Sequence, residues 1–131
     1  MAATPPLTRD VSGLATVLAT SGVLHLVRPE IYEGMVPHAL PRTRLVVHAS
    51  GVAELVCAAG LLHPATRRAA GYASAALLVL VLPANVQMSV DHGRRAARRG
   101  DAPSRATFAA TLARLPMQWP LIRTALRAAG R

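Results

Sequence analysis

Lysine is absent from this 131-residue sequence, aromatic residues make up only 3% of it, and it has a single cysteine. The lone cysteine excludes an internal disulfide. Charge is also scarce, because Asp, Glu, Lys and Arg account for 16% of the residues, whereas a soluble domain carries about 25%. What remains is apolar, since 52% of the residues are hydrophobic. This composition favours a membrane protein over a soluble domain.

The charge that is present is almost all of one sign. The 15 basic residues are all arginines, and the formal net charge is +9. A strongly basic chain typically binds nucleic acid or an anionic membrane surface. Here the arginines gather between long uncharged runs, as they do in the loops of membrane proteins, so the predicted partner is the lipid bilayer and not nucleic acid.

Four mainly apolar stretches have the length of a membrane-spanning helix, which needs about 20 residues. They cover residues 11–27, 45–62, 69–90 and 106–126. The fourth is the weakest, because two arginines and a glutamine interrupt it and two prolines are expected to bend it. No alternating barrel strands are visible, so the stretches are predicted to be helices. The sequence therefore predicts one all-α domain over residues 1–131, an integral membrane four-helix bundle.

The connections between these stretches differ in character. The first loop is rich in proline and is expected to hold a short interfacial helix around Tyr32 to Met35. The second, residues 63–68, is so short that the second and third helices must be antiparallel neighbours. The third, residues 91–105, is polar and basic, and we expect its arginines to contact lipid headgroups. Arginines are divided too evenly between the two sides to fix the orientation.

Several polar side chains fall inside the apolar stretches, where they are costly and mark function by default. The candidate ligand-binding residues are His25, His48, Glu54, Asn85, Arg114 and Gln118. Glu54 and His25 are the candidate proton relay, and Glu54 is predicted to form an ion pair with Arg114 because the two lie at similar depth. An equal alternative for the side-chain amides of Asn85 and Gln118 is that they form hydrogen bonds between helices.

A metal site is disfavoured. His25, His48 and His92 lie toward one side of the membrane, but no metal-ligand spacing or paired cysteine accompanies them. We therefore predict no metal. A nucleophile elbow and a glycine-rich phosphate loop are also missing from the sequence.

A series of short motifs runs along the chain in a fixed order. They are HxxxPxxYxxMVPxxLP from His25, SGVxEL from Ser50, GLLxP from Gly60, PANxxM from Pro83 and RLPxQ from Arg114. Over about residues 11–125 this series resembles the DoxX family of small bacterial membrane proteins. The resemblance implies a multi-pass four-helix bundle in the bacterial cytoplasmic (inner) membrane.

Members of that family include the small membrane subunit of thiosulfate:quinone oxidoreductase. The resemblance therefore implies an oxidoreductase-associated subunit whose polar pocket binds a quinone, with no covalently bound cofactor. The alternative is a non-enzymatic scaffold, assembly factor or accessory subunit of a larger membrane or redox complex. A second copy of the chain is a further candidate partner, and a transporter ranks last because no inverted repeat is evident. Whether the protein is itself an enzyme is left open.

Overall fold

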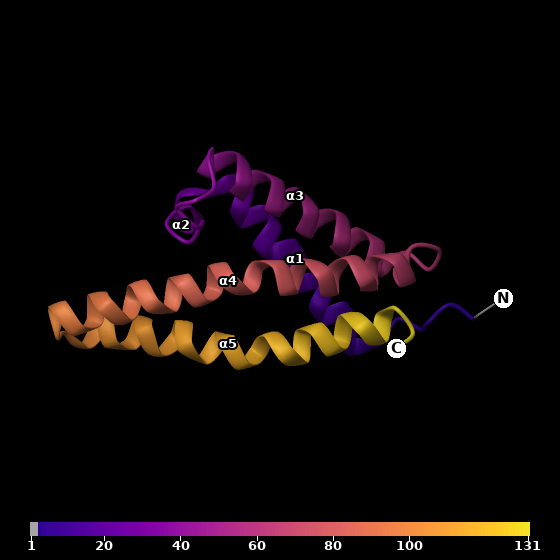
Figure 1. The fold of residues 1–131 in the computed structure, drawn as a ribbon. Helices are drawn as coiled ribbons and strands as arrows, with labels where there is room; N and C mark the ends of the chain where they lie inside the picture. The colour runs from indigo at the N-terminus through magenta and orange to yellow at the C-terminus, as the bar shows by residue number, and fades with distance from the viewer. Residues whose placement is uncertain (1–2) are drawn as a thin grey trace.

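Five α-helices make up the protein in the computed structural model, which describes residues 3–131 (Figure 1). They are α1 (Arg9–Val27), α2 (Glu30–Glu33), α3 (Thr43–Leu62), α4 (Arg67–Arg99) and α5 (Ala102–Ala128). No strand occurs among residues 3–131, and the all-helical prediction is confirmed. The four long helices follow the four apolar stretches in order. The fifth, α2, lies in the first loop where a short helix was expected.

Three of the long helices are apolar enough to cross a membrane. By length and composition these are α1, α3 and α4, and only 33% of the apolar stretch of each is buried within the protein. The exposed remainder includes large hydrophobic side chains such as Val56 and Leu80, which are 66% and 73% exposed. α5 has 27 residues, but its arginines and polar residues keep it below the same apolarity. It remains one unbroken helix through both prolines.

The predicted third loop is wrong. Residues 91–99 continue α4 and residues 102–105 begin α5, so the connection is only Gly100 and Asp101. Gly100 has a φ of 67°, which glycine adopts without steric cost, and Asp101 accepts a hydrogen bond from the backbone N–H of Ser104 at 2.8 Å. The 33 residues of α4 extend for about 50 Å, which exceeds the roughly 30 Å of bilayer hydrocarbon.

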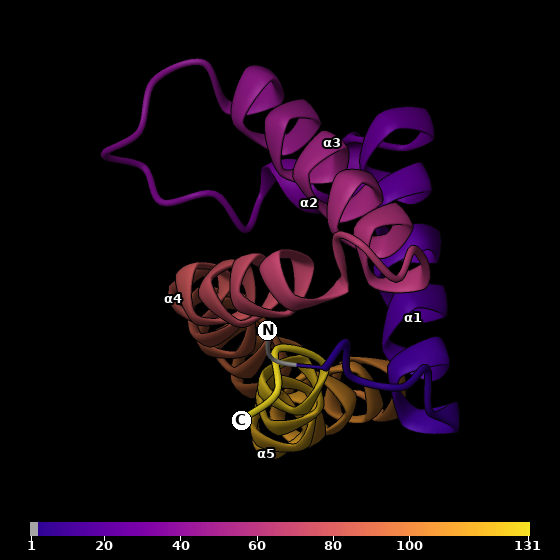
Figure 2. The ribbon, with the colours of Figure 1, turned by 90° about the vertical axis from the view of Figure 1, so that its right-hand side faces the viewer.

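The long helices form two pairs. α1 packs mainly on α3, and α4 packs along α5, while α3 also contacts α4 (Figure 2). The tip of the α4–α5 hairpin extends past the ends of the other pair (Figure 1). The shared apolar core includes Leu14 and Leu18 from α1, Leu61 from α3 and Ala125 from α5.

Glycines let the backbones approach closely within each pair, as small residues do in membrane bundles. A Cβ on Gly22 would lie 2.8 Å from the Gly51 carbonyl oxygen, and a Cβ on Gly51 would lie 2.9 Å from that of Gly22. In the other pair, a Cβ on Gly71 would lie 2.5 Å from the Ala129 nitrogen and 2.6 Å from the Ala125 oxygen. Each pair is therefore held at backbone contact at these positions.

Both described ends of the chain lie at the same end of the bundle (Figure 1). Asp10 of α1 pairs with Arg127 of α5 at 2.9 Å. Arg67 is buried there, and its guanidinium donates to the carbonyl oxygens of Leu61, Leu62 and Pro5 at 2.8, 3.0 and 2.7 Å. Leu61 and Leu62 end α3, so one side chain satisfies the carbonyls at this helix C-terminus.

Candidate functional site

A cavity of about 360 Å³ lies between the α1–α3 pair and the α4–α5 pair. Most of its wall is aliphatic, and the segment after α2 contributes Met35, Val36, Pro37 and Leu40 to it. Its polar lining comes from every helix. These residues are Ser21 and His25 of α1, Tyr32 of α2, Ser50 and Glu54 of α3, Asn85 of α4, and Arg114 and Gln118 of α5. Five of the six predicted ligand-binding residues thus line one space.

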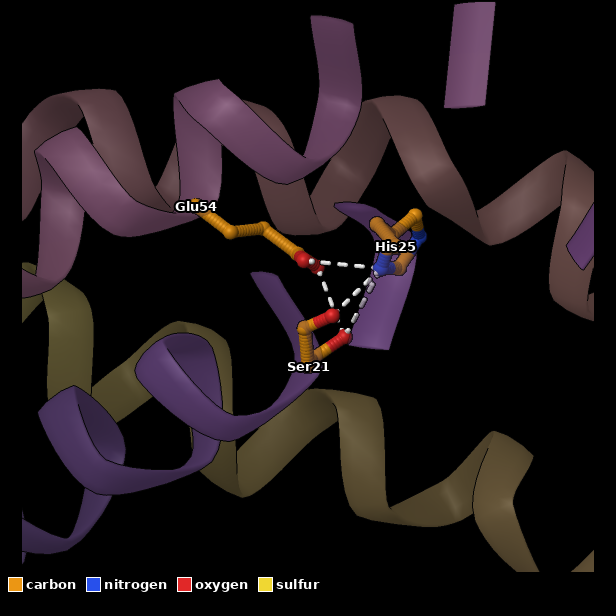
Figure 3. Close-up of polar contacts among 3 residues, drawn as sticks. All are labelled: Ser21, His25 and Glu54. Carbon is orange, nitrogen blue, oxygen red and sulfur yellow. Dashed lines mark hydrogen bonds and ion pairs between the residues drawn. The ribbon is translucent and has the colours of Figure 1, made fainter. Parts of the chain in front are cut away.

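Ser21, His25 and Glu54 form a buried cluster on one wall (Figure 3). The Ser21 hydroxyl donates to Glu54 Oε1 at 3.1 Å, and His25 Nδ1 lies 3.2 Å from Glu54 Oε2. Glu54 and His25 are only 7% and 9% exposed. Ser21 and His25 are one turn apart on α1, so a single helix face presents both to the carboxyl group on α3.

The His25 ring has a defined orientation. Its Nδ1 lies 2.6 Å from the carbonyl oxygen of Ser21, and a carbonyl oxygen can only accept, so Nδ1 carries the hydrogen. The ring stacks on Tyr32 with centroids 3.7 Å apart and planes 14° apart. In the neutral ring Nε2 is then the acceptor. The histidine can thus take up a proton at Nε2 without leaving its Ser21 bond.

Two oxygens on residues that line the cavity have no hydrogen-bond partner among the residues that the structure describes. They are Glu54 Oε2 and Gln118 Oε1, both fully buried from solvent. The Nδ1 hydrogen of His25 is directed at the Ser21 carbonyl, so the short distance to Oε2 is not a hydrogen bond. The side chains of Asn85 and Gln118 form no bond between helices within residues 3–131. A buried unpaired acceptor costs about 1–3 kcal/mol, so a donor that reached either oxygen after a side-chain rotation would stabilise it.

The predicted ion pair between Glu54 and Arg114 is wrong. None of the ion pairs among residues 3–131 includes Arg114, so no carboxylate lies within 4.0 Å of its guanidinium. Both residues line the cavity, as their similar depth suggested. The carboxyl group of Glu54 instead turns toward Ser21 and His25, because α1 packs directly on α3 whereas Arg114 lies on α5.

His48 is the predicted site residue that the structure separates from the others. It lies on α3 but does not line the cavity, because residues 47, 50 and 54 take the inward face of that helix. Within residues 3–131, no three His, Cys, Asp or Glu side chains lie close enough together to hold a metal ion.

Sequence reasoning did not identify Ser21 or Tyr32 as members of this site. Ser21 could have been found, because it lies four residues before His25 and therefore on the same helix face. Tyr32 could not, since its stacking on His25 depends on how the proline-rich segment folds back over α1. Chemically, the site combines an aliphatic pocket with a titratable cluster and unpaired acceptors at one end.

Comparison with known proteins identifies the family to which the chain belongs. No curated protein and no solved structure matches the chain. A family model does match, and its description is Domain of unknown function (DUF8561), over residues 14–129. The matched segment includes α1 from Leu14 onward, the other three long helices and all the polar residues of the cavity, and on this basis the chain belongs to the DUF8561 family.

Proposed function

We propose that this chain is a multi-pass protein of the bacterial cytoplasmic membrane, with a DoxX-like bundle in which all four long helices cross the bilayer. Three of them have the necessary length and apolarity. The fourth, α5, lies against α4 from Gly71, beside Ala125 and Ala129, to Gly93, beside Phe108. A membrane-crossing α4 therefore takes α5 with it, and Gln118 of α5 is buried beside the cavity.

Within that bundle, the cavity binds the headgroup of a quinone-type lipid. The observation that carries this proposal is the aliphatic cavity with the unpaired oxygens of Glu54 and Gln118 in its surroundings. A reduced headgroup carries two hydroxyl donors, which suit these acceptors, and the Asn85 amide and Arg114 guanidinium can donate to the carbonyls of the oxidised form. A volume of about 360 Å³ lies within the range of about 300–1,000 Å³ typical of ligand pockets.

Glu54 and His25 can then exchange protons with the bound headgroup. Oxidation of a quinol releases two electrons and two protons; the Glu54 carboxylate can take up one proton and His25 Nε2 the other. The electrons pass to a partner protein, so the chain acts as the quinone-binding subunit of a redox complex. This role follows the resemblance of the sequence motifs to the DoxX family.

A binding titration with a short-tailed quinol analogue in detergent tests the proposal. We expect Glu54→Gln and His25→Ala to weaken binding by about tenfold each, because each removes a hydrogen-bonding or proton-accepting group. His48→Ala is the matched control, since that histidine lies outside the cavity, and it should bind as the unmodified chain does. Equal affinity in Glu54→Gln, His25→Ala and the control would reject quinone binding at this site.

The tip of the α4–α5 hairpin supports a second candidate function, that of an accessory or scaffold subunit. Five exposed arginines lie there with no carboxylate within 4.0 Å among the described residues: Arg94, Arg95, Arg98, Arg99 and Arg105. An acidic surface of a partner protein would complement them. Co-purification of a partner at fixed stoichiometry, lost when the arginines are changed to glutamine, would favour this role.

A further inference from the structure

A second hollow lies on the outer side of the bundle, between α1 and α5. It is open to the surroundings, has a volume of about 290 Å³, and is lined by Thr16, Val17, Thr20, Ser21, Leu24, Tyr32 and Arg114. Four of these residues also line the cavity, so the two spaces adjoin. The hollow exists because α1 packs mainly on α3 and α5 mainly on α4, which leaves the α1–α5 side loosely closed.

Arg114 gives this hollow a positive charge with no carboxylate of residues 3–131 in direct contact with it. It is an exposed residue near the middle of α5, in the same part of the bundle as the cavity. A charge at such a depth needs a partner or access to the membrane surface. The nearby carboxyl group of Glu54 is turned toward Ser21 and His25, and no other carboxylate among residues 3–131 lies within 4.0 Å of Arg114. A negative group in direct contact with this guanidinium would therefore have to come from outside residues 3–131.

The other polar groups of the hollow are hydroxyls, which suit an anion. Thr16 and Thr20 lie one turn apart on the same face of α1. The Thr16 hydroxyl donates to the Ser12 carbonyl oxygen, whereas the Thr20 and Tyr32 hydroxyls donate to no other group within residues 3–131. A guanidinium with free hydroxyl donors beside it complements the oxygens of a phosphate. Val17 and Leu24 add apolar contacts next to these donors.

We propose that the hollow between α1 and α5 binds the phosphate of an anionic phospholipid from the surrounding bilayer. Arg114 supplies the counter-charge, the Thr20 and Tyr32 hydroxyls donate to the phosphate oxygens, and the acyl chains lie along the apolar surface of α1. This site rests on the proposed membrane insertion but not on quinone binding. It assigns a role to the Arg114 charge, which the Glu54 carboxyl group does not contact directly.

Native mass spectrometry of the delipidated protein in neutral detergent tests the site, with phosphatidylglycerol, phosphatidylcholine and inorganic phosphate as separate probes. We expect one phosphatidylglycerol to bind in preference to phosphatidylcholine. Arg114→Gln should weaken it by roughly 10- to 100-fold, and Thr20→Val, which keeps the charge and shape, by roughly 3- to 10-fold. Arg123→Gln removes the same charge from α5 outside the hollow and should change the affinity by less than about twofold.

Three outcomes would overturn the proposal. Equal weakening by Arg114→Gln and Arg123→Gln would mean diffuse attraction to the basic surface. Inorganic phosphate binding as tightly as phosphatidylglycerol would assign the hollow to free phosphate. If neither Thr20→Val nor Arg114→Gln changes the affinity, the lipid binds elsewhere. Because Glu54→Gln should leave lipid binding intact, failure of quinone binding and failure of this site give different results.

Discussion

The change from Arg67 to alanine is expected to be among the most destabilising single substitutions in this protein. Arg67 is only 5% exposed, and its three guanidinium nitrogens each donate to a different backbone carbonyl. Two of these carbonyls end α3 and the third, that of Pro5, belongs to the segment before α1. Alanine would leave all three without this donor.

The size of the effect follows from the number of bonds. Each hydrogen bond from a charged donor contributes about 1.5–3 kcal/mol, and carbonyls near a helix end recover part of this from water, so the loss should be about 3–5 kcal/mol. Arg67→Lys keeps the charge, but a single ammonium group cannot reach three separated carbonyls as the planar guanidinium does. We expect it to recover about half of the loss.

Unfolding in mixed detergent micelles, followed by circular dichroism, measures this free energy. Arg68→Ala is the matched control, because Arg68 is the exposed neighbour and makes only a 3.5 Å contact to the Ala3 carbonyl. Its effect should remain within about 0.5 kcal/mol. If Arg67→Ala is no less stable than Arg68→Ala, the carbonyl-capping role of Arg67 is refuted.

Two further substitutions test the α4–α5 hairpin. Gly71→Val should destabilise the fold by about 1–3 kcal/mol or more, because its Cβ would meet the backbone of α5 and of the residue after it, which cannot rotate away. Gly34→Ala is the control in the same unfolding assay: its Cβ would have nothing within 4 Å, so it should be nearly neutral. At the tip, the side chain and backbone N–H of Ser104 hold the pKa of Asp101 below its ordinary value of 3.8. The ionised form therefore stabilises the start of α5 above pH ~4, and this stabilisation is lost as the pH falls through the lower folded pKa. The amide protection factors of the first α5 turn, which are corrected for the intrinsic pH dependence of exchange, should fall on acidification in the unmodified chain and stay constant in Asp101→Asn. The same fall in that variant would contradict the assignment.

The sequence was sufficient to predict helices and a shared polar cavity, because both depend on position along each helix. Apolar runs of membrane length set the elements, and residues near the same surface met across the bundle, as His25, Glu54 and Gln118 do. The partner of Glu54 was not predictable in this way. Depth along a helix says nothing about its rotation, and the direct packing of α1 on α3 gave the carboxyl group Ser21 and His25 in place of Arg114.

The hairpin tip shows a different limit. Residues 91–105 were interpreted as a loop because they are charged, yet alanine and arginine are both strong helix formers. Outside a membrane, polarity does not end a helix. The breaks come where the backbone chemistry changes, at Gly100 with its positive φ and at Asp101, whose side chain caps the next helix.

The Asp10–Arg127 contact has a consequence for the order in which the protein is made. It joins the first long helix to the last, and the two residues are separated by nearly the whole described chain. During synthesis the carboxylate of Asp10 emerges long before its arginine exists, so the nascent α1–α3 pair must wait with its α5-facing side open. This side of the bundle therefore closes only after α5 has been synthesised, and a chain stopped before α5 would leave it exposed.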